Sequence, residues 1–272
     1  MGAASDSTEL GVPSDPAPGP RERPSVSVPL ALGEPFRNEH WLSRTLVASA
    51  WLLIPIVGFV VVRGWAAVGF TRMLQHHPDP FPRLRLSDLR IYLRHGAPSA
   101  SVLLASLALL GFSALAGVGL INAGLWATVL SGGTLALTLL ATAIVLATVL
   151  LGWVLLLGNA ILTRAEISGR LGQALAPGSV WPQARSAWAR TLFAYSLFVP
   201  LALLLLTVGA SVGCLGALPV WVILELASTH LRYQIYERQT RGGVPRLAAP
   251  VPKLLPSEAR MVSSGKLEAR TR

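Results

Sequence analysis

The sequence predicts an all-α, polytopic membrane protein with four full spans plus an N-terminal broken hairpin or fifth span. An uncharged stretch at 96–163 is dense in Leu, Ala, Val and Gly. About 20 such residues cross about 30 Å of hydrocarbon, so this stretch is long enough for two helices and a turn. Charged residues make up only 13% of the chain, and the mean hydropathy is +0.55. Soluble domains usually carry about 25% charged residues.

The net charge of +10 is distributed unevenly. Positive charge gathers in the segments 63–96, 164–190 and 232–272, and two predicted crossings separate each from the next. Because Lys and Arg hold loops in the cytoplasm, we expect these basic loops and the C-terminus on the cytoplasmic side of the cell membrane. A high pI can indicate nucleic-acid binding. Here the arginines flank apolar runs, so we expect no nucleic-acid partner.

The chain divides into two polar tails and a membrane domain. Residues 1–34 are rich in Pro, Ser, Gly and Ala and are predicted to be a disordered tail, as is the basic segment 238–272. Residues 35–237 between them form the helical membrane domain. Its apolar segments are expected at about 45–62, 98–121, 134–158, 192–212 and 219–236.

The first apolar segment, 45–62, leaves two alternatives open. Pro55 lies near its middle, and a helix-like pattern continues past Arg63 to Leu74. One alternative is a spanning helix that ends near Arg63 and places the N-terminal tail outside, with five crossings. The other is a helical hairpin, broken around 55–58, that places the tail inside. Irregular backbone at membrane depth is tolerated only where it packs in protein or contacts water.

The loop that follows combines prolines with basic residues. Three prolines exclude a helix at its start. From Ser87, apolar residues recur at helical spacing opposite Arg90 and Arg94, which predicts a short interfacial helix with a basic face. Together with the segment 164–190, this loop supplies arginines that we expect to contact the anionic headgroups of the lipid bilayer. These residues are Arg83, Arg85, Arg90, Arg94, Arg185 and Arg190.

Small residues recur at four-residue spacing in the spans 98–121 and 134–158. Examples are Ser113 with Gly117 and Gly119 with Ala123. Small faces let membrane helices approach closely. We expect this feature to serve packing within the protein, and contact with a membrane-protein partner or a second copy is the alternative.

Glu225 is the most unusual residue of the apolar segments. It lies a few residues inside the last span, where an unpaired carboxylate costs several kcal/mol. The structural interpretation pairs it with Arg63 or with Thr229 at position i+4. The functional interpretation makes the three residues an intramembrane polar site for a proton, a cation or a substrate.

Motifs of soluble enzymes do not occur in the sequence. It has no Gly-rich phosphate loop, no His-Glu metal motif, no Cys pair and no nucleophile elbow. We therefore expect no catalytic residue, no cofactor and no metal site. The His residues at 76, 77 and 95 match no known ligand spacing.

Several segments resemble one family of bacterial and archaeal multi-pass membrane proteins, known only as a domain of unknown function. The matching segments are PFRNEHW at 35–41, LIPIVG at 53–58, GW at 64–65 and the proline-led loop up to residue 96. The segment LRYQIY at 231–236 is similar to the family's end but lacks its usual Gly. The loop lacks the family's Trp, and its acidic residue is displaced to Asp88. The resemblance covers about 35–237 and implies a multi-pass fold without an assigned activity.

Two functional hypotheses follow. In the first, the protein has a scaffold, assembly or envelope-homeostasis role without catalysis and acts through helix packing and basic surfaces. In the second, it is a small transporter or channel-like protein that uses Glu225 in a polar pathway, since broken helices build midplane sites in transporters.

Overall fold

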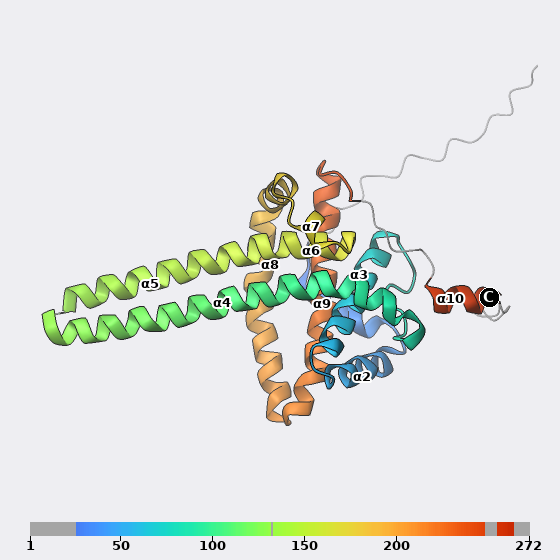
Figure 1. The fold of residues 1–272 in the computed structure, drawn as a ribbon, viewed down its shortest axis with the longest axis horizontal. Coiled ribbons are helices and arrows are strands. Elements are labelled where there is room, and N and C mark those ends of the chain that lie inside the picture. The colour runs from blue at the N-terminus through green and yellow to red at the C-terminus, as the bar shows by residue number, and fades with distance from the viewer. Residues whose placement is uncertain (1–25, 132, 248–254, 264–272) are drawn as a thin grey trace, which may run out of the picture.

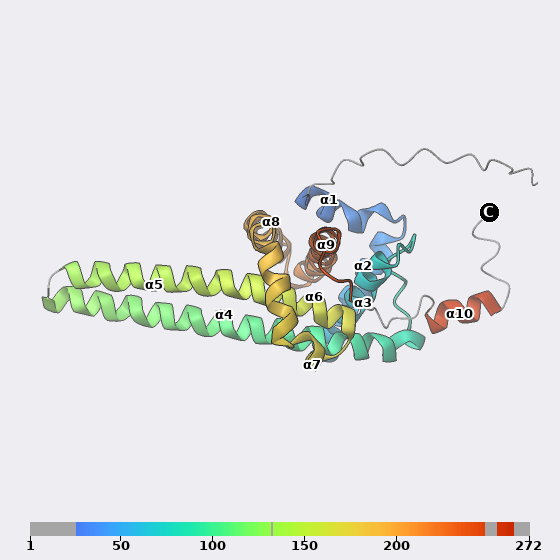
Figure 2. The ribbon, with the colours of Figure 1, turned by 90° about the horizontal axis from the view of Figure 1, so that it is seen from above.

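The computed structural model describes residues 26–131, 133–247 and 255–263, and within these ranges the protein is all-α without strands. The chain forms a body and a long helical pair that projects from it (Figure 1). The pair consists of α4 (Leu89–Ser131) and α5 (Gly133–Trp153). The view from above shows the same separation between body and pair (Figure 2).

The helix α3 (Val57–Leu74) forms the centre of the body. Most of its residues are buried, and the side chains of Trp65 and Phe70 are fully enclosed. It contacts α2 (Trp41–Leu52), the base of α4, α6 (Asn159–Ser168) and α9 (Cys214–Arg241). A helix that is apolar on all sides is stable only when neighbours cover every face. The other elements of the body therefore pack around α3.

The break between α2 and α3 shows that the first segment is a broken hairpin and not one continuous helix. The break covers 53–56, where Ile56 adopts a positive φ of 62°. Arg44 of α2 donates a hydrogen bond to the Phe81 carbonyl, and Trp65 of α3 donates to the Pro82 carbonyl at 2.7 Å. Because both helices contact the same loop, α2 folds back beside α3 as a broken hairpin. At 12 residues, or about 18 Å, α2 is too short to cross a bilayer.

The ordered part of the chain extends beyond the expected 35–237. The helix α1 (Val28–Gly33) and the 3₁₀ turn η1 (Glu34–Arg37) pack against α9, and the Ser27 N–H donates to Gln234 Oε1 at 2.8 Å. At the other end, α9 continues to Arg241, and α10 (Pro256–Ser263) contacts the 3₁₀ turn η2 (Leu86–Asp88). The predicted disorder is therefore wrong for these residues. The tail residues 1–25, 248–254 and 264–272 lie outside the described ranges.

The long pair also departs from the expected boundaries. The helix α4 continues past 121, the expected end of its span, and ends at Ser131, and α5 continues through the π-helical turn η3 (Val154–Gly158) into α6. At 1.5 Å per residue, the 43 residues of α4 extend about 65 Å, about twice the hydrocarbon thickness. Such a helix tilts in the bilayer or protrudes from it.

Helices α8 (Pro177–Ser211) and α9 form a second pair, which runs crosswise to α4–α5 (Figure 1). A single bilayer normal is therefore not parallel to both pairs. The short helix α7 (Leu171–Ala174) precedes α8. The expected helix start at Pro219 is wrong, since α9 begins at Cys214, and Pro200 lies inside α8 as expected.

Four helical segments within the described residues are long and apolar enough to cross a membrane. They are Val57–Leu74, Leu86–Trp126, Leu137–Ser168 and Pro177–Ser211. The sequence analysis also expected four full spans, but one of the four segments is different. The expected segment 219–236 lies in the polar helix α9 and is not one of the four, whereas α3, the second arm of the broken hairpin, has the required length and apolarity. Length and apolarity thus define an all-α membrane protein.

Helices α3 and α4 cross at two glycines. A Cβ on Gly64 would lie 1.8 Å from the Tyr92 carbonyl oxygen, and a Cβ on Gly96 would lie 1.9 Å from the Val60 carbonyl oxygen. Only glycine permits this backbone contact. The crossing fixes the base of α4 against the central helix.

We predict that Gly96→Ala lowers the stability of the detergent-solubilised protein by at least the 1–3 kcal/mol or so typical of overpacking, because the two backbones must separate. Gly117→Ala is the matched control, since nothing lies within 4 Å of its missing Cβ. Thermal unfolding monitored by circular dichroism measures both variants. Equal melting temperatures for the two variants would contradict the close crossing.

Candidate functional site

Arg63 is the buried charge at the centre of the body. It lies in α3, and only 1% of its side chain is exposed. Its Nη1 donates to Oε1 of Glu225 in α9, which is the pairing that the sequence analysis named. Its Nη2 donates to Oε1 of Glu166 in α6 at 2.9 Å. An arginine that is removed from water needs such charged partners, since unpaired burial costs several kcal/mol.

A second arginine completes the cluster. Arg232 of α9 donates from Nη2 to Glu166 Oε1 at 2.8 Å and from Nε to Oε2 at 3.2 Å. It also donates from Nη1 to Ser228 Oγ at 2.6 Å and from Nη2 to Thr229 Oγ1 at 2.9 Å. The Thr229 hydroxyl in turn donates to the Glu225 backbone carbonyl at 2.8 Å.

We call Arg63, Glu166, Glu225 and Arg232 the charge cluster. It contains two positive and two negative groups, and each side chain is at most 7% exposed. The carboxylate of Glu166 bridges both arginines, so helices α3, α6 and α9 are tied at one point. The charge balance and the close packing of these helices favour the structural interpretation of Glu225 and Arg63.

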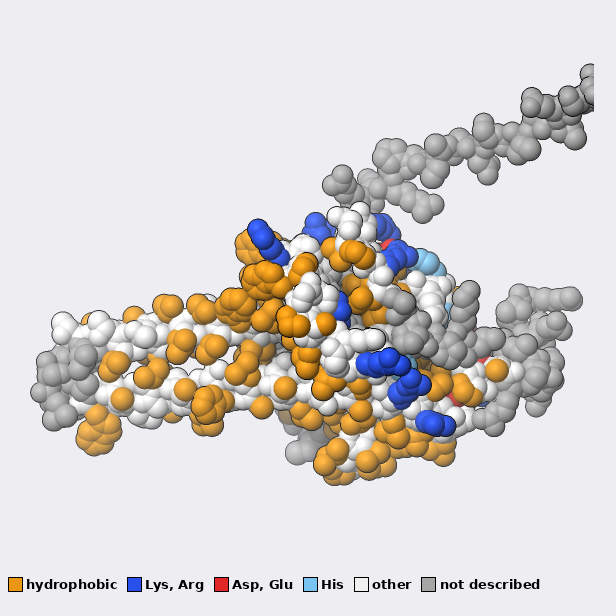
Figure 3. Space-filling view, turned by 45° about the horizontal axis from the view of Figure 1, so that its top comes forward, with side chains coloured by type: hydrophobic (Ala, Val, Ile, Leu, Met, Phe, Trp, Pro, Cys, Tyr) orange, Lys and Arg blue, Asp and Glu red, His pale blue; other side chains and the backbone are white. Residues whose placement is uncertain are grey.

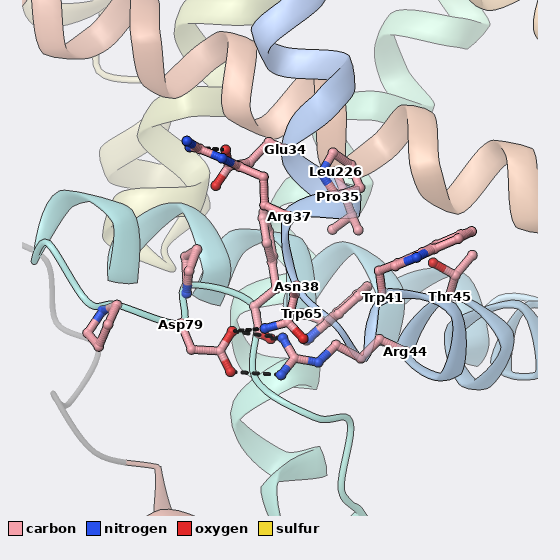
Figure 4. A pocket seen from close by; sticks show the side chains of 13 residues that line it. Glu34, Pro35, Arg37, Asn38, Trp41, Arg44, Thr45, Trp65, Asp79 and Leu226 are labelled. Atoms are coloured by element: carbon pink, nitrogen blue, oxygen red, sulfur yellow. Dashed lines mark hydrogen bonds and ion pairs between the residues drawn. The ribbon is translucent and has the colours of Figure 1, made fainter. Parts of the chain in front are cut away.

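A small pocket lies on the N-terminal side of the body (Figure 4). It has a volume of about 100 Å³, and its polar lining centres on Arg44 and Asp79. Arg44 donates to the two Asp79 oxygens at 2.8 and 2.7 Å, and Asn38 Nδ2 donates to Oδ1 at 3.4 Å. This bidentate pair holds α2, the segment after η1 and the proline loop together.

The C-terminal helix α10 docks beside the same loop. Arg72 Nη1 donates to both oxygens of Glu258 at 2.9 Å, and the Ser257 N–H donates to Asp88 Oδ1 at 3.0 Å. Burial lowers the pKa of His77, and the neighbouring Arg72 lowers that pKa further. Burial alone would raise the pKa of Glu258, but hydrogen bonds from Arg72 and from the Leu255 N–H outweigh it and lower the pKa. At neutral pH the contact therefore combines a neutral imidazole with an ionised carboxylate.

Five of the six arginines expected at lipid headgroups are exposed on the body, and Arg85 is partly buried. Arg83 and Arg85 line a polar pocket of about 390 Å³ together with Arg44. Contact of these residues with lipid stays a prediction. Among the residues that the structure describes, no group of three or more His, Cys, Asp or Glu side chains is arranged to hold a metal ion.

The sequence analysis named Arg63, Glu225 and Thr229 and missed Glu166 and Arg232. Both missed residues lie in the basic segments 164–190 and 232–272, which we expected on the cytoplasmic side. The signal available in the sequence was the isolated acidic residue of the basic segment 164–190, since Glu166 is its sole carboxylate.

Fold and cluster together define the class: an all-α membrane protein with a charge-paired body and a projecting apolar helical pair. Comparison with protein-family models, with curated proteins and with solved structures returns no match. The site must therefore be interpreted from its own chemistry.

We predict that Glu166→Gln destabilises the protein by about 3–5 kcal/mol, because it removes the carboxylate that both arginines share. Glu225→Gln should cost less, since Glu166 still contacts Arg63. The double variant Arg63→Met with Glu225→Leu leaves one positive and one negative group in the cluster. It should therefore recover much of the stability that Glu225→Gln loses. Thermal unfolding in detergent and the amount of membrane-inserted protein measure these effects.

The same variants separate the structural role from the functional one. If the cluster is structural, Glu166→Gln and Glu225→Gln both melt at a lower temperature than the wild type. If Glu225→Gln keeps the wild-type melting temperature while a proton or ion flux disappears, the structural interpretation is wrong.

Proposed function

We propose that the protein is a scaffold or assembly protein of the cell membrane, with an envelope-homeostasis role and without catalysis. We further propose that its helical body lies at the cytoplasmic side and that its α4–α5 pair contacts a membrane-protein partner or a second copy. The resemblance to the bacterial family of multi-pass membrane proteins belongs to this proposal and supplies no activity.

The exposure of the α4–α5 pair carries the proposal. Phe112 and Leu115 of α4 are each 73% exposed, and Leu137 of α5 is 67% exposed. Hydrophobic side chains cover the pair in the space-filling view, and the Lys and Arg side chains on this face lie over the body (Figure 3). Surface of this kind is solvated by lipid or by other helices.

Open glycines on the pair support a helical partner. Nothing lies within 4 Å of the missing Cβ of Gly111, Gly117 or Gly119. The intramolecular packing that we expected for the small residues does not use these glycines. Small residues on a lipid-facing helix let a second helix approach closely.

The paired charges of the body support a role without transport. Glu225 is 7% exposed, and both arginines of the charge cluster lie within 3.5 Å of its Oε1. None of the three pockets described for this protein includes it in the lining. A transport pathway would need this carboxylate to exchange partners or water, so the transporter hypothesis has the weaker support.

Contacts between basic segments support a body on one side of the membrane. Gln234 accepts from the Ser27 N–H at 2.8 Å, and Gln239 Nε2 donates to the Gln183 carbonyl at 2.7 Å. Together with the Arg44–Asp79 pair, these bonds join the N-terminal segment to all three basic segments. Positive charge favours the cytoplasmic side for such a body.

We predict that photo-crosslinking from position 112 captures protein. Phe112→p-benzoylphenylalanine faces outward on α4, and Phe70→p-benzoylphenylalanine is the matched control inside the body. Irradiation of membranes should give a protein adduct at 112 and none at 70. The adduct mass distinguishes a second copy from another protein, whereas adducts with lipid alone would contradict the proposal.

Orientation is tested with single cysteines in a Cys214→Ser background. An exposed cysteine at position 126 should react with a membrane-impermeant maleimide in intact cells. A cysteine at position 36 should react only after permeabilisation, because α2 folds back to the cytoplasmic side. Labelling at position 36 in intact cells would place the N-terminal segment outside.

A further inference from the structure

The root of the α4–α5 pair holds an apolar pocket of about 490 Å³. Its lining comes from α4, from the end of α5 with η3, from α6 and from α7. The lining includes Ser101, Ala105, Ser106, Val154, Leu157 and Leu171. A pocket of this size accommodates one small molecule and is too small for a helix.

The mostly apolar lining favours a hydrocarbon chain over a polar ligand. The polar side-chain groups there are the hydroxyls of Ser101 and Ser106 and the indole N–H of Trp153. Ser101 donates to the Ala97 carbonyl at 2.9 Å, and Ser106 donates to the Val102 carbonyl at 2.9 Å, so both hydroxyl hydrogens are already used. A strongly polar ligand would lose more hydration than these few groups replace, whereas an acyl chain has no polar group to leave unpaired.

The π-helical turn η3 contributes to the hollow. Val154, Leu157 and Gly158 all lie in this turn and all line the pocket. A Cβ on Gly158 would lie 3.2 Å from Ser106 Oγ, so the absence of a side chain there keeps the space open. Single π-helical turns inside α-helices occur frequently at functional sites.

Two exposed arginines, which are not part of the lining, lie close to it along the chain. Arg170 directly precedes Leu171 of the lining, and Arg94 lies two helical turns before Ser101 on the same face of α4. Gly169 and His95, the chain neighbours of these arginines, lie close together, since a Cβ on Gly169 would be 2.9 Å from the His95 ring. The segments that carry the two arginines therefore meet next to the elements that form the pocket.

We propose that this pocket binds one anionic phospholipid, with an acyl chain between α4 and η3 and the phosphate between Arg94 and Arg170. The occupant follows from the combination of a hydrocarbon-lined cavity and two cations beside it. Each arginine near an anionic headgroup contributes about 1 kcal/mol. The site goes beyond the general headgroup contacts expected from the sequence, because Arg170 and the pocket together define a single position for the lipid.

The experiment measures lipid binding to the purified full-length protein by native mass spectrometry from detergent. We expect phosphatidylglycerol to remain bound as one molecule per chain, more tightly than phosphatidylcholine, and inorganic phosphate alone not to bind. The variant Arg94→Gln with Arg170→Gln should weaken phosphatidylglycerol binding about thirtyfold, which corresponds to about 1 kcal/mol for each arginine. Ala105→Trp should abolish retention by filling the pocket.

A matched control separates this site from general surface charge. The variant Arg185→Gln with Arg190→Gln removes two exposed arginines of α8, a helix that contributes no residue to the pocket. It should bind phosphatidylglycerol as the wild type does. Equal weakening in both arginine pairs, or unchanged binding in Ala105→Trp with an unchanged melting temperature, would overturn the proposal.

Discussion

The structure depends on the burial of Arg63 inside an apolar helix. A guanidinium without water needs nearby carboxylates and hydrogen bonds to offset its desolvation. Glu166 and Glu225 supply them from positions 103 and 162 residues away along the chain. Arg232 then balances the second negative charge. Because α3 contributes the first charge, α6 and α9 must both lie against it, and this requirement fixes how the central helices of the body meet.

The remaining architecture follows from the separation of charged and apolar residues between the body and the α4–α5 pair. Inside the body, arginines are paired: Arg44 with Asp79, Arg72 with Glu258, and the charge cluster between them. Outside it, α4–α5 carries no charge from residue 96 to the end of α5, so nothing ties this pair to a polar partner. Its surface can be satisfied by hydrocarbon and by other helices. This surface is the feature on which the proposed association within the membrane depends.

Part of the site was predictable from the sequence, for a definite reason. Glu225 stands alone in an apolar run, and such a carboxylate needs a cation; Arg63 was one of few candidates inside another run. Glu166 and Arg232 lie among charges that also fit a headgroup layer, so hydropathy gave no reason to place them in the core. The end of the span at 121 was wrong because Asn122 and Gly124 are also compatible with a turn, whereas the helix continues to Ser131.

The sequence by itself determined the helical class, the membrane environment and the presence of long apolar helices, because these depend on local hydrophobicity along the chain. Only the tertiary structure decided that α2 folds back, that α3 is the central helix, and that α8–α9 runs crosswise to α4–α5. Those features depend on contacts between residues far apart in the chain, such as Arg44 with Asp79 and Arg63 with Glu225. Hydropathy identifies which segments avoid water, and charge pairing determines which of them pack together.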